Sequence, residues 1–336
     1  EANSTLVAIR RGPNYSKYGF SWNRSFLNAQ GELAFQKGLF LEAEIAFKKG
    51  IQVYEAGMDE YEKSFLAAGE GLGVPGLGGN SNSGNPNSGK DALEGSYVKL
   101  SETLLKLRKV NEAEYYAREA LKKSLVRTGK ASLATSRGLR QLAVVMLARE
   151  RNKDAIYLLE QSLKGLLEAG VTSESIQLAV TKKTMAAALI SDDRYAEALK
   201  IYSDLDITLK NYPETGRFVD ANSPDRILAL VKTGDLANAE KAAQSLLNLN
   251  EVRTGKSSKE TTQSRLLLAT TLADQRKDDA AQSIFSTAIK DFNMALTGIV
   301  AYVTARFGQL PWLQRALKPT SPVARSFANK IATWLI

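Results

Sequence analysis

Small apolar residues recur along this chain at a fixed distance from larger apolar ones. Ala143 follows Leu142 and lies 12 positions before Ala155, and Leu159 comes four positions after Ala155. A small side chain lets two helices cross closely, and large apolar side chains three or four positions away fill the space on either side. This segment therefore predicts two helices that pack against each other.

The same spacing of small and apolar residues is found in five segments, and a sixth segment follows it in part. Each has an alanine at the start of its second helix, and we call these residues the marker alanines: Ala43, Ala113, Ala155, Ala198, Ala239 and Ala281. Successive marker alanines are 70, 42, 43, 41 and 42 residues apart. A fixed period of this length is typical of repeat proteins. We expect an all-α solenoid of about six helix pairs. The fifth pair departs from the pattern, with Ile227 at the small position of its first helix and Pro224 near its start.

A pentapeptide marks two of the boundaries between helix pairs. Val126–Lys130 reads Val-Arg-Thr-Gly-Lys, and the same five residues return 126 positions later at Val252–Lys256. The marker alanines place the two copies in the turns before the third and sixth pairs. Within pairs, we expect short polar turns at 37–38, 151–153, 192–194 and 233–235, as antiparallel helices require.

These positions resemble the tetratricopeptide repeat (TPR) motif: a small residue in the first helix, a small residue opening the second, and a bulky residue four positions later. The period of about 42 residues is longer than the usual one of about 34. It is similar to the long-helix repeats of kinesin light chains and of many bacterial signalling proteins. The resemblance covers roughly Arg24 to Gly298. It implies a right-handed α-α superhelix that binds partners in its concave groove.

The repeat pattern also divides the chain into regions. We expect an N-terminal extension at 1–23, the first TPR at 24–68, the second to sixth TPRs at 94–298, and capping helices or a linker at 299–336. Residues 69–93 are rich in Gly, Asn and Ser, and we expect a flexible insertion there, because ordering such a stretch loses much entropy and buries little surface. The glycine pattern that begins at Gly71 matches a dinucleotide-binding motif in letters only, and the pattern that begins at Gly84 nearly matches a P-loop but has Asp91 in place of Ser or Thr. No strand precedes either pattern. We therefore expect no cofactor.

The chain has no histidine and no cysteine. Their absence removes the commonest general base, the commonest metal ligand and all thiolate chemistry. Neighbouring carboxylates, such as Glu112 and Glu114, lie where a helix N-terminus favours acidic side chains. We therefore expect no enzymatic activity, no catalytic residue and no metal site.

The net charge and the start of the chain give only general indications about partners and location. The formal net charge of +9 favours anionic partners in a general way. No apolar run reaches the length that a transmembrane helix needs. The chain starts at Glu1 rather than Met, as a cleaved export signal or a domain cut from a longer protein would leave it. Because a chain without cysteine suits an oxidising compartment, an exported or periplasmic location is favoured over the cytoplasm.

The resemblance also implies which side chains line the groove, namely positions 2, 5, 9 and 12 of each first helix. They include Arg137, Arg140, Val144 and Leu147 in the third pair, Lys183, Ala187 and Ile190 in the fourth, and Glu102 in the second. Chaperone-binding relatives clamp a terminal carboxylate with Lys and Asn one helical turn apart. Here Val144 follows Arg140, and Ala187 follows Lys183. We therefore expect a protein or peptide segment with acidic and apolar side chains, and not a chaperone tail.

Three functions can be weighed on these residues. The leading hypothesis is a protein–protein interaction scaffold. The alternative is the sensing or regulatory region of a larger bacterial enzyme, such as a caspase-like peptidase, whose catalytic domain lies outside this chain. Nucleic-acid binding is disfavoured, because helical-repeat RNA readers use fixed side-chain pairs, whereas the groove positions here change in type from one pair to the next.

Overall fold

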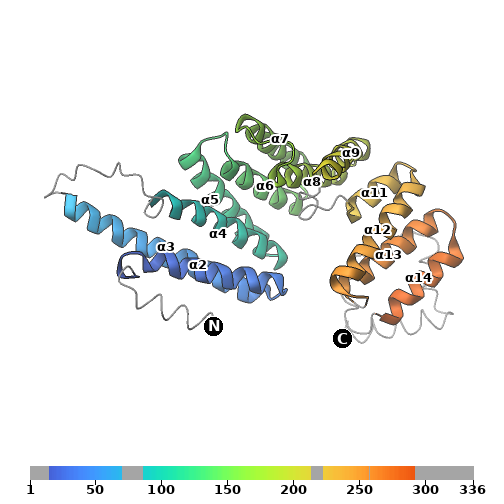
Figure 1. The fold of residues 1–336 in the computed structure, drawn as a ribbon, viewed down its shortest axis with the longest axis horizontal. Coiled ribbons are helices and arrows are strands. Elements are labelled where there is room, and N and C mark those ends of the chain that lie inside the picture. The colour runs from blue at the N-terminus through green and yellow to red at the C-terminus, as the bar shows by residue number, and fades with distance from the viewer. Residues whose placement is uncertain (1–14, 70–85, 213–221, 257, 292–336) are drawn as a thin grey trace. The chain divides into compact units, whose positions relative to one another are not determined.

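The computed structural model describes residues 15–69, 86–212, 222–256 and 258–291. All regular secondary structure in these ranges is α-helical (Figure 1). The chain divides into two compact units, Glu1–Asp192 and Asp193–Ile336, and each is considered by itself. A search of the same ranges finds no helix with the length and hydropathy of a membrane span.

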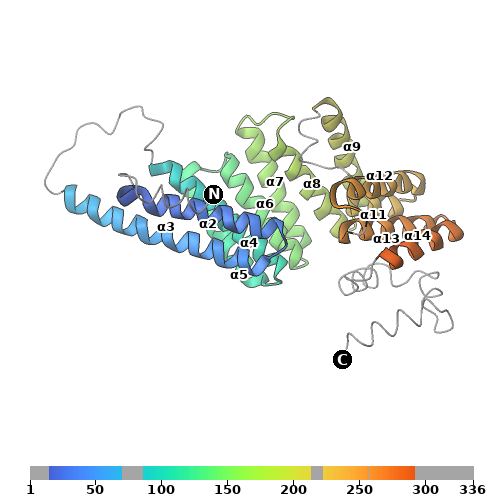
Figure 2. The same cartoon turned by 60° about the horizontal axis from the view of Figure 1, so that its bottom comes forward.

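The first unit is a stack of helices. It contains α2 (Tyr15–Gln36), α3 (Phe40–Gly69), α4 (Pro86–Lys106), α5 (Val110–Thr128), α6 (Leu133–Ala148), α7 (Asn152–Glu168) and α8 (Ile176–Ser191). Consecutive helices pack side by side, as Figure 1 and Figure 2 show. The first helices of successive pairs also contact each other, α2 with α4, α4 with α6, and α6 with α8. These four helices therefore form one continuous layer.

The second unit contains α9 (Tyr195–Asn211), α11 (Pro224–Lys232), α12 (Leu236–Thr254), α13 (Lys259–Asp274) and α14 (Asp278–Asp291). Its irregular pair is formed by α11 and α12. Pro224 opens α11, where a missing N–H needs no partner, and Ser223 Oγ accepts a hydrogen bond from the backbone of Arg226 at 3.3 Å. Ile227 is completely buried. A short, well-capped helix thus accommodates the larger residue at the small position.

The marker alanines lie near the start of the second helix of each pair, and in the pairs that lie within one unit the two helices pack against each other. All six are buried, with an exposed fraction of at most 1%. The first pair shows how close the crossing is, because a Cβ on Gly31 would lie 2.8 Å from the ring of Phe47. The sequence prediction of small residues at helix crossings is confirmed, and with it the all-α solenoid.

The turn inside each pair has one backbone conformation. The residue five positions before each marker alanine has a positive φ of 59° to 84°, and in four of the six turns it is not glycine: Gly38, Arg108, Glu150, Asp193, Gly234 and Arg276. In the first, second, third, fifth and sixth pairs, the residue after it donates its N–H back to the helix, as Arg151 does to the carbonyl of Met146 at 2.9 Å. This bond satisfies a carbonyl at the helix end. The turn of the third pair is at Glu150, slightly before the expected segment 151–153, which already begins α7.

Two region boundaries differ from the sequence prediction. Helix α2 begins at Tyr15, inside the expected extension 1–23, and α4 begins at Pro86, inside the expected insertion 69–93. Leu93 and Glu94 are buried, and Glu94 forms an ion pair with Arg127 at 2.8 Å, which explains why the end of this glycine-rich stretch is helical. Residues 70–85 and the expected capping region 299–336 lie outside the described residues.

The two copies of the pentapeptide form the same turn. Gly129 and Gly255 have φ values of 72° and 89°. The hydroxyl of Thr135 donates to the carbonyl of Gly129 at 2.6 Å, and that of Thr261 donates to Gly255 at 2.7 Å. Two residues after each pentapeptide, a serine caps the next helix by accepting from the backbone N–H of the same threonine, at 3.1 Å in both copies. This repeated network fixes the start of α6 and of α13.

Candidate partner-binding groove

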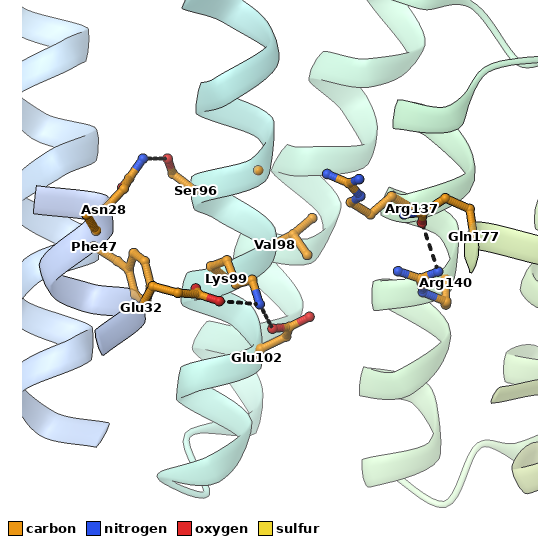
Figure 3. A pocket seen from close by; sticks show the side chains of 12 residues that line it. Asn28, Glu32, Phe47, Ser96, Val98, Lys99, Glu102, Arg137, Arg140 and Gln177 are labelled. Atoms are coloured by element: carbon orange, nitrogen blue, oxygen red, sulfur yellow. Dashed lines mark hydrogen bonds and ion pairs between the residues drawn. The ribbon is translucent and has the colours of Figure 1, made fainter. Parts of the chain in front are cut away.

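The layer of first helices in the first unit is hollowed. The hollow has a volume of about 570 Å³ and is lined by residues of α2, α4 and α6, together with Phe47 of α3 and Gln177 of α8. It brings together three of the residues expected to line the groove, Glu102, Arg137 and Arg140 (Figure 3). We call this hollow the groove.

One end of the groove carries a compact charge cluster. The ammonium group of Lys99 lies 3.2 Å from the carboxylate of Glu32 and 3.1 Å from that of Glu102. Burial alone would lower the pKa of Lys99, but the carboxylates of Glu102 and Glu32 outweigh it, and the pKa is raised above its usual value. The carboxylate of Glu102 is therefore already paired with the ammonium group of Lys99, so Glu102 is not simply an exposed residue of the groove lining.

The other end carries two arginines on α6. Arg140 Nη1 lies 3.4 Å from both Gln177 Oε1 and Thr181 Oγ1, and both contacts are long. Burial lowers the pKa of Arg140, the charge of Arg137 lowers it further, and only Glu102 opposes them. Within the described ranges, no carboxylate comes within ion-pair distance of Arg137 or Arg140. Two like charges therefore face the groove with no carboxylate at ion-pair distance, and a bound anion would relieve their repulsion.

The remaining expected groove residues lie outside this hollow. Val144 and Leu147 are half-buried on α6, as are Lys183 and Ala187 on α8. Ile190, which the sequence analysis also expects in the groove lining, is only 4% exposed. The residues before it, Ala188 and Leu189, are buried too, and a helix buried on several faces has no amphipathic pattern from which an open face can be read.

Sequence reasoning missed the residues of the first pair. Asn28 and Glu32 of α2 line the groove, and Asn28 Nδ2 donates to Ser96 Oγ at 2.7 Å. Both stand at the same distance from the small residue Gly31 as Arg140 and Val144 do from Ala143. Counting from Gly31 would have found them. Lys99 could not be found in this way, because it lies between the expected positions.

The second unit has a smaller hollow of different chemistry. Its volume is about 260 Å³, and its lining includes Asn250 and Glu260, Gln263 and Leu267. None of the residues that line it is basic. A surplus of positive charge is thus a property of the groove in the first unit, not of every hollow on this scaffold.

Comparisons with known proteins agree on the fold. BtubC from P. vanneervenii superposes with a TM-score of 0.50 at 17% identity, covering 61% of this chain and 82% of BtubC. A Podosopora anserina protein described as a kinesin light chain with nearly identical TPR-like repeats gives a TM-score of 0.48 at 14% identity, covering 60% of this chain and 95% of that one. Pseudomonas aeruginosa pilF gives a TM-score of 0.45 at 19% identity, covering 72% of this chain and 99% of pilF.

No protein-family profile matches the chain, and no curated protein matches it either. At these identities the likeness concerns the fold alone. The chain has the TPR-like helical-repeat fold. This confirms, at the level of the fold, the resemblance drawn from the marker alanines.

Proposed function

We propose that this chain is an interaction scaffold that binds an acidic segment of a partner polypeptide in the groove of its first unit. The observation that carries the proposal is the pair Arg137 and Arg140, two cations on one helix face with no carboxylate at ion-pair distance in the described residues. Arg140 is also partly buried, and its charge is disfavoured there. A carboxylate offers such a pair the charge-assisted hydrogen bonds that it lacks.

The rest of the lining favours a polypeptide. Ala29, Phe47 and Val98 provide apolar surface beside the charged groups, and peptide grooves commonly combine apolar contacts with a few charged ones. Glu32 and Glu102 add negative charge to the same hollow. A nucleic-acid backbone carries a phosphate at every step and would be repelled by these carboxylates, whereas a peptide can place one acidic side chain at the arginines.

The test starts from a library of random 12-residue peptides displayed on phage and selected against the full chain. Peptides that bind are synthesised, and their dissociation constants are measured against the wild type and the double variant R137Q/R140L. This variant installs the residues that the chain itself has 126 positions later, Gln263 and Leu266. We expect enrichment of Asp and Glu and a loss of at least about tenfold in affinity, as removal of one side of a charged contact usually gives.

A matched control removes the same charge elsewhere. R118Q/R151Q replaces two arginines whose side chains are 57% and 53% exposed and lie outside the groove lining. It should bind the selected peptides as the wild type does. Unchanged binding by R137Q/R140L, or an equal loss in both double variants, would contradict the proposal, because the affinity would then depend on total charge or on another surface.

A further inference from the structure

A glycine interrupts α4 at the floor of the groove. Gly95 lies inside α4, between the buried residues Glu94 and Ser96. Glycine weakens a helix interior relative to alanine, because it has more conformational freedom to lose on folding. Its φ is not among the positive values of the chain, so the backbone at this position could carry any side chain.

Other helix glycines in the first unit are explained by packing. A Cβ on Gly31 would lie 2.8 Å from the Phe47 ring, one on Gly138 would lie 3.0 Å from the Cα of Leu121, and one on Gly165 would lie 3.1 Å from the carbonyl oxygen of Lys130. Each of these glycines lets two segments approach closely. Around a Cβ on Gly95, by contrast, no heavy atom lies within 4 Å apart from its two chain neighbours and the nearby backbone of α4 itself. The packing of the described residues therefore gives no reason for glycine here.

The open space beside Gly95 belongs to the groove. Gly95 lines it together with Val98 and with Arg137 of the neighbouring helix α6. Counted from the small residue of each first helix, Gly95 and Arg137 occupy the same position, since Ser101 and Ala143 each follow six residues later. At the position where α6 presents a long cation to the groove, α4 presents no side chain.

We infer that Gly95 is a specificity-determining residue: it leaves the space in which the acidic partner segment comes into direct contact with the backbone of α4 while its carboxylate reaches Arg137 and Arg140. The inference rests on the proposed function. Glycine is the residue that allows another chain to approach a backbone closely. A side chain at position 95 would occupy part of the groove beside the arginines, and its size would then decide whether the segment fits.

The test is a size series at this position. G95A and G95L are prepared in the full chain and compared with the wild type for thermal unfolding, followed by circular dichroism, and for affinity toward the peptides selected above. We expect both variants to unfold at or above the wild-type temperature, because each residue is a better helix former than glycine and the added Cβ lies in open space. We expect G95A to lose affinity by a few fold and G95L by at least about tenfold.

Two controls make the outcome specific. Q30L places leucine on the exposed surface of the neighbouring helix α2, outside the groove lining, and should bind normally. G138A forces a methyl group against the backbone of Leu121 and should unfold at a lower temperature, which shows that the measurement detects a glycine required for packing.

The possible results separate this inference from the function on which it rests. If the peptides depend on Arg137 and Arg140 but bind equally well to G95L and the wild type, the role of Gly95 is wrong and the proposed function stands. If R137Q/R140L also binds normally, the proposed function itself fails. A lowered unfolding temperature for G95A would show a packing role for the glycine and would overturn the inference as well.

Discussion

Helices α6 and α13 follow two copies of the same turn and stand at the same place in their helix pairs. Ala143 and Ala269, at equivalent positions, are both fully buried. Thr135 and Thr261 make the same hydrogen bond to a left-handed glycine. The residues that determine where these two helices begin and how closely each crosses its partner helix are therefore the same in both units.

At two other equivalent positions of the same two helices the side chains differ. Where α6 has Arg137 and Arg140, α13 has Gln263 and Leu266. Leu266 is only 8% exposed, whereas Arg137 is exposed and Arg140 is half-buried in the groove. The comparison teaches that the scaffold and the proposed binding chemistry reside in separate residues: turn and crossing residues build the helix pair, and the proposed function depends on positions 2 and 5.

The largest effect is expected where the two copies are most alike. A143L and A269L each force a larger side chain into a crossing with no free space, and overpacking of this kind typically costs about 1–3 kcal/mol. We expect a similar loss in both, measured by urea unfolding, with amide hydrogen exchange locating it in the unit that carries the change. Leucine at Ala148, exposed at the end of α6, is the control. A harmless A269L would mean that the second crossing is looser than the first.

The second largest effect is expected at a position where α6 and α13 differ. L266R places a guanidinium group at a site with 8% exposure, and burial of an unpaired charge should lower the free energy of unfolding of the second unit by about 2 kcal/mol. The reverse change, R140L, removes a charge that burial and Arg137 disfavour, so the first unit should be as stable as the wild type or more so. Equal tolerance of arginine at both positions would erase the distinction between the two units.

A smaller effect is expected in the shared turn. T135V and T261V keep the shape of side chains that are at most 1% exposed and remove the hydroxyl that donates to the glycine carbonyl. Each should lower the free energy of unfolding by about 1 kcal/mol, the usual contribution of such a bond. Hydrogen exchange should increase at the start of α6 in one variant and of α13 in the other. A loss in only one of them would mean that one turn is maintained by other contacts.

This division also explains how much could be predicted from sequence. The marker alanines and the pentapeptide were visible because burial and turn geometry permit few residue types at such sites, so the fold and register followed from them. Positions 2 and 5 tolerate many residues, and only the resemblance to TPR proteins pointed to Arg137 and Arg140. The engagement of Glu102 by Lys99, the burial of Ile190 and the space beside Gly95 depend on neighbouring helices, and no local pattern records them.

The smallest effect concerns an ion pair that joins neighbouring helix pairs in each unit. Glu44 and Glu240 directly follow a marker alanine, and each pairs with the lysine four positions before the next one, Lys109 or Lys277, at 2.8 Å. Burial alone would raise the pKa of Glu44, but hydrogen bonds from Lys109 and Lys48 outweigh it and lower the pKa. The hydrogen bond from Lys277 lowers the pKa of Glu240. The two pairs differ in exposure, since the side chain of Glu44 is 8% exposed and that of Glu240 is 33% exposed.

A carboxylate with a lowered pKa stabilises the fold above its unfolded pKa of about 4.3, and this stability is lost as the pH falls through the folded pKa. At pH 7 we therefore expect E44Q to lower the free energy of unfolding by up to about 1 kcal/mol and E240Q by less, because exposed pairs contribute little. As urea unfolding is repeated from pH 7 down to pH 3, the difference between E44Q and the wild type should shrink. If the difference in stability between E44Q and the wild type does not change with pH, Glu44 acts through its shape and not its charge. The Glu44–Lys109 and Glu240–Lys277 pairs would then not play the same role.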